Sequence, residues 1–172
     1  VSANMNGSTP APSGASQLPE PPDSSRLSHT DRAQSFHPER FRPLFYIAAL
    51  WNLAAAGVAL GAPDYHAEIF FGSDQVLANP AAAMNTQIVW ISVAFFGIGY
   101  WIVARDPSKN HALILIAALG KACVAFLWFS GFLLGTVTSF ALLGAAGDLI
   151  FATLFAHFLL RAYSSSGEQP RI

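Results

Sequence analysis

Four apolar stretches of about 20 residues each follow residue 42, and they limit the folds open to this chain more than any other feature. A helix of about 20 residues rises 1.5 Å per residue and covers the roughly 30 Å hydrocarbon core of a bilayer. These stretches also lack the polar face of a soluble core helix of similar length. The sequence therefore predicts an all-α, four-transmembrane-helix bundle at 43–162, with helices at about 43–62, 86–104, 112–134 and 139–160.

Charged residues are scarce, which agrees with a lipid bilayer as the surroundings of most of the chain. The 172 residues include 10 acidic and 9 basic ones, or 11%, whereas an ordinary soluble domain carries about 25%. A net charge of −1 without a basic cluster argues against nucleic acid as a partner. The single cysteine excludes an internal disulfide and a thiolate metal cage. A soluble enzyme of ordinary composition is therefore not expected.

Residues 1–42 differ in composition from the rest of the chain and predict a disordered tail. The segment is rich in serine, proline, alanine and glycine and has no periodic apolar stripe. Its prolines lack a backbone donor and resist helix formation, so it buries too little apolar surface to offset its ordering entropy. A docking or regulatory arm is the functional alternative. Residues 163–172 are expected to form a second, short tail.

The basic residues predict the orientation of the bundle. The connections 63–85 and 135–138 contain no lysine or arginine. Eight of the nine basic residues fall on the opposite side: Arg26, Arg32, Arg40, Arg42, Arg105, Lys109, Arg161 and Arg171. The positive-inside rule then places both termini in the cytoplasm (N-in/C-in). We expect the protein in the inner, cytoplasmic membrane.

The connection 63–85 is the one long segment between two predicted spans, and its pattern predicts a short amphipathic helix at the outer surface. We expect this helix to cap the mouth of the bundle. His66 and Glu68 stand two residues apart, which matches no established metal-ligand spacing. They are therefore expected to be solvated polar side chains on an interfacial turn, and no metal site is predicted.

Two charged residues lie inside the predicted spans, and their registers place them near each other. A charge in the hydrocarbon core is costly, so such residues normally face the bundle interior and pair. In a hairpin that leaves one helix at Leu134 and enters the next at Ser139, the numbers of facing residues sum to 273. The numbers of Lys121 and Asp148 sum to 269, an offset of four residues or about 6 Å, which a lysine stem can span. The sequence predicts a Lys121–Asp148 ion pair.

Asn52 and a set of small residues complete the predicted polar centre. Asn52 lies nine residues from the inner end of its helix, at the depth of Lys121, and its amide can bridge a charge pair. Small residues that allow close helix packing share the face of Asp148 on the last predicted helix: Ala141, Gly144, Ala145 and Ala152. The segment Gly97–Gly99 of the second predicted helix could likewise admit a close contact.

Three functions are compatible with this polar centre. In the preferred interpretation it fixes helix register in a non-enzymatic membrane component, which acts with a membrane-protein partner or as a homo-oligomer. The alternatives are a small carrier for protons or polar solutes, and an enzyme on a lipophilic substrate with Asp148 as acid or base. His157 is the one histidine within a predicted span, which excludes a paired-histidine haem site. No catalytic residue and no cofactor are predicted.

Several segments resemble a widespread group of small bacterial inner-membrane proteins. These segments are 41–57 (FRPLFYIAALWNLAAAG), 97–110 (GIGYWIVARDPSKN), 118–121 (ALGK) and 147–151 (GDLIF). In size and topology the chain is similar to DoxX-like proteins over about residues 43–162. The resemblance implies a bacterial four-helix membrane bundle, and it supplies no functional residues to carry over.

Overall fold

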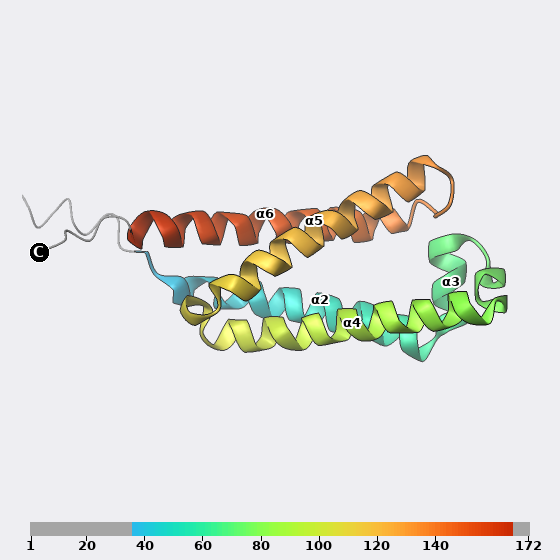
Figure 1. The fold of residues 1–172 in the computed structure, drawn as a ribbon, viewed down its shortest axis with the longest axis horizontal. Helices are drawn as coiled ribbons and strands as arrows, with labels where there is room; N and C mark the ends of the chain where they lie inside the picture. The colour runs from blue at the N-terminus through green and yellow to red at the C-terminus, as the bar shows by residue number, and fades with distance from the viewer. Residues whose placement is uncertain (1–35, 167–172) are drawn as a thin grey trace, which may run out of the picture. The chain divides into compact units, whose positions relative to one another are not determined.

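A computed structural model describes residues 36–166, and within this range the chain is helical with no strand, as predicted. The predicted disorder of the N-terminal tail therefore falls largely outside the described residues. Figure 1 shows the elements, which are η1 (Pro38–Phe41), α2 (Arg42–Gly61), α3 (Pro63–Phe71), η2 (Asp74–Ala78), α4 (Pro80–Arg105), η3 (Pro107–Lys109), α5 (His111–Leu133) and α6 (Ala141–Ser166).

The four long helices are apolar enough to cross a membrane. Their most apolar windows have mean hydropathies between 1.7 and 2.2. Only 28% to 33% of each window is buried inside the protein, so most of its apolar surface faces outward. A soluble protein rarely exposes contiguous apolar surface on this scale, whereas lipid solvates it. The chain is therefore a multi-pass integral membrane protein.

The helix ends differ from the predicted ones where caps and prolines are decisive. The structure starts α4 at Pro80, six residues before the predicted start at 86. Asn79 caps this helix, since its side chain accepts hydrogen bonds from the backbone N–H groups of Ala81 (2.9 Å) and Ala82 (3.3 Å). Pro80 occupies the first turn, where its missing N–H costs nothing. Hydropathy alone predicts the apolar centre of this helix, but it does not predict where the capped helix begins.

The helices associate in two pairs, α2 with α4 and α5 with α6. Gly97 of α4 allows the first pair to approach closely. A Cβ atom at this position would lie 2.8 Å from Leu53 Cγ and 3.3 Å from the Ala49 carbonyl oxygen of α2. The close contact expected at Gly97–Gly99 is thus present at Gly97, as small residues permit in membrane helix packing.

At one end of the bundle an aromatic core joins the two pairs. The Phe45 ring of α2 lies 5.0 Å from that of Phe155 and 5.5 Å from that of Phe158, both on α6. Tyr100 of α4 packs edge-on against Phe155 at 5.5 Å. Phe36 contacts Phe158 at 5.4 Å, so the first described residues and the last turns of α6 lie at this same end. We call it the packed end.

At the opposite end the short helix α3 connects the two pairs. Its Phe70 carbonyl accepts a hydrogen bond from the Thr138 N–H at 2.8 Å, and its Ile69 carbonyl accepts one from the Thr138 hydroxyl. The Phe70 ring lies 5.2 Å from both Trp128 of α5 and Phe140. The helix predicted within 63–85 is therefore present, and it is held between α4 and the α5–α6 connection.

Candidate functional site

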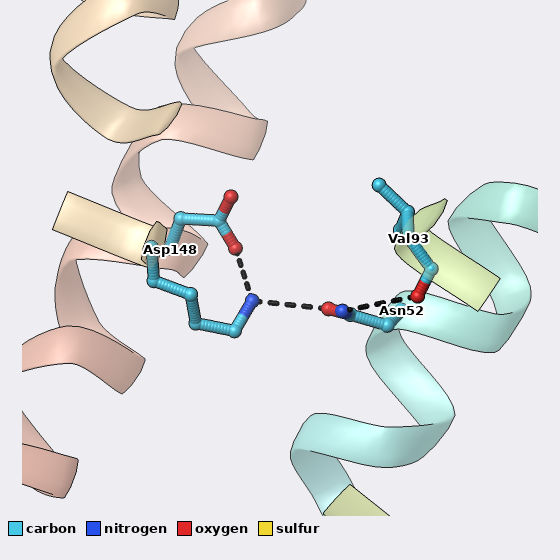
Figure 2. Close-up of polar contacts among 4 residues, drawn as sticks. Asn52, Val93 and Asp148 are labelled. Atoms are coloured by element: carbon cyan, nitrogen blue, oxygen red, sulfur yellow. Dashed lines mark hydrogen bonds and ion pairs between the residues drawn. The ribbon is translucent and has the colours of Figure 1, made fainter. Parts of the chain in front are cut away.

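A line of polar contacts crosses the bundle and touches all four long helices (Figure 2). The Lys121 Nζ of α5 donates to Asp148 Oδ1 of α6 at 2.5 Å and to Asn52 Oδ1 of α2 at 3.0 Å. The Asn52 Nδ2 in turn donates to the Val93 carbonyl oxygen of α4 at 3.4 Å. The structure thus brings together the three residues that the sequence proposed as a polar centre.

This polar line is removed from solvent and lipid, which explains why its members pair. Lys121 is 5% exposed, Asn52 is 6% exposed and the Asp148 side chain is 14% exposed. The ammonium group also lies 5.6 Å from the Tyr100 ring centroid and 5.2 Å from that of Phe151. A carboxylate, an amide oxygen and two ring faces together compensate the lysine charge.

The pair keeps hydrogen-bonding capacity beyond these contacts. An ammonium group has three N–H donors, and the contacts to Asp148 and Asn52 use two of them. Among the residues that the structure describes, no hydrogen bond reaches the second carboxylate oxygen of Asp148. One donor and one acceptor are therefore available to a molecule placed beside the pair.

A cavity of about 680 Å³ lies directly beside Asn52, Lys121 and Asp148. Ligand sites for drug-sized molecules have volumes of roughly 300–1,000 Å³ and combine apolar walls with a few polar groups. This cavity has that character, because the three polar residues occupy one part of a lining that is otherwise mostly apolar or aromatic. The apolar lining includes Trp51, Ala55, Val89, Phe96, Val124 and Trp128.

The cavity exists because small residues stand where helix contacts would otherwise fill the space. Gly120 and Gly144 both line it, and a Cβ at Gly144 would approach the Trp128 and Phe70 side chains at 3.8 and 3.9 Å. The predicted small-residue face of α6 therefore has two roles. Its alanines are buried against neighbouring helices (Ala141, Ala145 and Ala152), while Gly144 leaves space in the cavity.

Trp51 of α2 lies against α6 at Gly147. A Cβ at Gly147 would lie only 2.5 Å from Trp51 Cζ2, so glycine is the residue that lets the indole rest against the α6 backbone. The same indole lines the cavity. This tryptophan is therefore a wall of the site as well as a packing residue.

His66 contradicts the prediction of a solvated side chain. It is 2% exposed, and its ring stacks on Phe70 at 4.5 Å and meets Trp90 edge-on at 4.7 Å. Neither ring nitrogen has a hydrogen-bond partner among the described residues, and His66 lines the cavity. Burial lowers the pKa of His66, which favours the neutral imidazole. The signal in the sequence was the i, i+4 spacing of His66 and Phe70, which puts both on the buried face of α3.

Other residues singled out in the sequence lie away from this site. Cys123 is exposed on α5. His157 is also exposed, and its ring lies 6.4 Å from that of Phe41. Within residues 36–166 no group of three histidine, cysteine or acidic side chains is placed to hold a metal ion.

Comparisons with known proteins find no matching family model, no matching curated protein and no matching solved structure. The resemblance to DoxX-like proteins is therefore supported only by its coarsest part, a small membrane protein with four apolar helices.

Proposed function

We propose that this protein is a non-enzymatic membrane component that binds an uncharged, amphipathic small molecule. The observation that carries the proposal is the cavity of about 680 Å³, whose walls are mostly apolar and which reaches Asn52, Lys121 and Asp148. An ion pair that only holds the helices in register does not require a cavity next to it. In this proposal the polar line fixes helix register and also receives the polar end of the ligand.

The charges at the site support an uncharged ligand. Lys121 and Asp148 neutralise each other at 2.5 Å in surroundings that are largely apolar. An ionic headgroup would compete for one member of the pair and leave the other uncompensated, which is strongly unfavourable in a buried site. A hydroxyl or carbonyl group instead matches the available N–H donor and carboxylate oxygen without disturbing the pair.

We propose that the packed end faces the cytoplasm of a bacterial inner membrane, so that both termini are cytoplasmic. Five described basic residues support this orientation because they belong to the termini and the η3 connection: Arg40, Arg42, Arg105, Lys109 and Arg161. The exposed Asp64 and Glu68 belong to α3 at the opposite end. This distribution follows the positive-inside rule.

A carrier for the same class of molecule is a second candidate. The packing of the helices as two pairs favours it, because α2 with α4 and α5 with α6 could move as two bodies around the cavity. Uptake of a probe into sealed proteoliposomes separates the two functions. Transport faster than in vesicles without protein supports the carrier, and binding without transport supports a non-transporting component.

Binding itself can be tested with a cavity-filling variant and a matched control. The probe is para-hydroxybiphenyl, an apolar molecule with one hydroxyl group, and the full-length protein is reconstituted in phosphatidylcholine nanodiscs. Gly144→Leu extends a side chain toward Trp128 and Phe70, whereas a Cβ at Gly57 meets nothing within 4 Å and Gly57 does not line the cavity. Nanodiscs with wild type or Gly57→Leu should retain more probe than empty nanodiscs. Nanodiscs with Gly144→Leu should retain no more than empty ones. Equal retention by all three proteins would contradict the proposal.

A further inference from the structure

A second polar group lines the same cavity near its α3 end. The His66 ring is 2% exposed, and neither of its nitrogens has a hydrogen-bond partner among the described residues. A buried polar group without a partner costs free energy, and buried side-chain polar atoms are in most cases paired. The ring lines the cavity, and because both nitrogens are enclosed by protein, a molecule there can bond His66 once the ring turns toward it.

The packing of His66 places it one to two helical turns from the polar line. On α4, the contacted residue Trp90 precedes Val93 by three positions, or about 4.5 Å of helix. On α5, Trp128 is seven positions beyond Lys121, or about 10 Å, and it contacts Phe70, on which His66 stacks. The two polar regions are therefore roughly 5–10 Å apart along the bundle.

The surroundings of His66 also favour an uncharged partner. The rings that face it come from α3 and α4 and are all apolar or aromatic: Phe70, Phe71 and Trp90. Burial lowers the pKa of this imidazole, which stays neutral and offers one N–H donor and one nitrogen acceptor. A hydroxyl or carbonyl group can pair with either nitrogen.

We propose that His66 is the second anchor of the cavity and that its ligands carry uncharged hydrogen-bonding groups at both ends of an apolar body. One end bonds Lys121 and Asp148, and the other bonds His66. The flat indole walls of Trp51, Trp90 and Trp128 suit a planar ring body between the two ends. This inference rests on the proposed function, because it assigns a ligand class to the same cavity.

The test compares three rigid probes that differ only in their hydroxyl groups. These are naphthalene, 2-naphthol and 2,6-dihydroxynaphthalene, whose fused rings are planar and hold the two hydroxyl groups at opposite ends. Each probe is equilibrated with the full-length protein in nanodiscs, and bound probe is quantified by mass spectrometry after subtraction of empty nanodiscs. One additional hydrogen bond corresponds to roughly threefold to tenfold in affinity. The dihydroxy probe should therefore bind roughly threefold to tenfold more tightly than the monohydroxy probe.

His66→Phe keeps an aromatic ring against Phe70 and Trp90 and removes both ring nitrogens, so it should abolish that preference. His66→Gln should restore part of it. His111→Phe is the matched control, because His111 also has a buried ring nitrogen without a partner among the described residues and does not line the cavity. It should leave the preference unchanged.

The outcomes separate this inference from the proposed function. Suppose that all probes bind wild type, that Gly144→Leu excludes them, and that His66→Phe keeps the preference for two hydroxyl groups. The second anchor is then wrong, and the binding function stands. If no probe binds wild type above empty nanodiscs, both are wrong. Loss of the preference in His66→Phe, with the monohydroxy probe still bound as tightly as by wild type, supports both.

Discussion

The two ends of the bundle use the same four long helices in opposite ways. At the packed end, Phe45, Phe155 and Phe158 are fully buried and their rings fill the space between the helix pairs. At the α3 end the same helices leave about 680 Å³ between them. The difference follows from residue size along α6, where large rings at the packed end give way to small residues near its start: Ala141, Gly144 and Ala145. One half of the bundle is therefore densely packed, and the other half contains the cavity.

The polar line marks the boundary between these two halves. Tyr100 and Phe151 meet the Lys121 ammonium group through their rings, and Phe151 and Tyr100 both belong to the packed-end core. Asn52, Lys121 and Asp148 line the cavity, and Tyr100 lines it as well. A charged pair at this boundary is held in place by dense packing and is accessible to a molecule in the cavity. Such support is what a precise binding site requires.

The largest expected effect comes from removing one member of the pair. Lys121→Met leaves Asp148 as an uncompensated buried charge and should cost about 3–5 kcal/mol of stability. It should also weaken binding of para-hydroxybiphenyl roughly threefold to tenfold, because one hydrogen bond to the ligand is lost. Denaturant unfolding in mixed micelles measures the first effect, and nanodisc retention measures the second.

The double variant Lys121→Met/Asp148→Leu sharpens this comparison. It replaces the pair by apolar side chains and should recover much of the stability that Lys121→Met loses. Probe binding should stay weakened, because the apolar walls remain and the polar end of the cavity is gone. A stable double variant that still binds the probe normally would show that the pair is a register clamp alone.

Phe155→Ala tests the packed end by itself. This ring is fully buried between Phe45 and Tyr100, and its removal should cost about 3 kcal/mol. Phe155 does not line the cavity, so the affinity of the remaining folded protein for the probe should stay within twofold of wild type. Denaturant unfolding measures the loss of stability. The amount of probe retained per folded protein molecule measures the affinity. A large loss of affinity would mean that the two halves are coupled.

A smaller effect is expected where α2 and α4 touch. Gly97→Ala introduces a Cβ 2.8 Å from Leu53 Cγ, and the helices must separate slightly, which should cost about 1–3 kcal/mol. Gly57→Ala is the matched control on α2, where a Cβ meets nothing within 4 Å. It should leave stability unchanged or raise it by up to about 1 kcal/mol. Equal effects of the two variants in thermal unfolding would argue against close packing at Gly97.

The two halves also differ in how far the sequence predicts them. The positions of the four spans follow from hydropathy, which depends on the residues of each span alone. The contact of Lys121 with Asp148 follows from helix register, because both residues belong to one hairpin. The cavity depends on how far the two helix pairs diverge, and no periodic pattern encodes that distance. His66 was missed for a related reason. Its burial requires α3 to fold back against Trp90, which lies 24 residues further along the chain.

The smallest expected effect is a pH dependence at the α3 end. Burial lowers the pKa of His66 below its ordinary value of 6.5, so the folded protein takes up this proton less readily than the unfolded chain. Stability from this residue is therefore fully present above about pH 6.5 and falls as the pH drops through that value. His66→Gln removes the titrating group and should make the melting temperature less sensitive between about pH 7.5 and pH 5.5. The other histidines and the exposed Asp64 and Glu68 are common to both proteins and cancel in the difference. If the melting temperatures of the two proteins depended on pH in the same way, His66 would be accessible to water. In that case α3 would not close the cavity at this end.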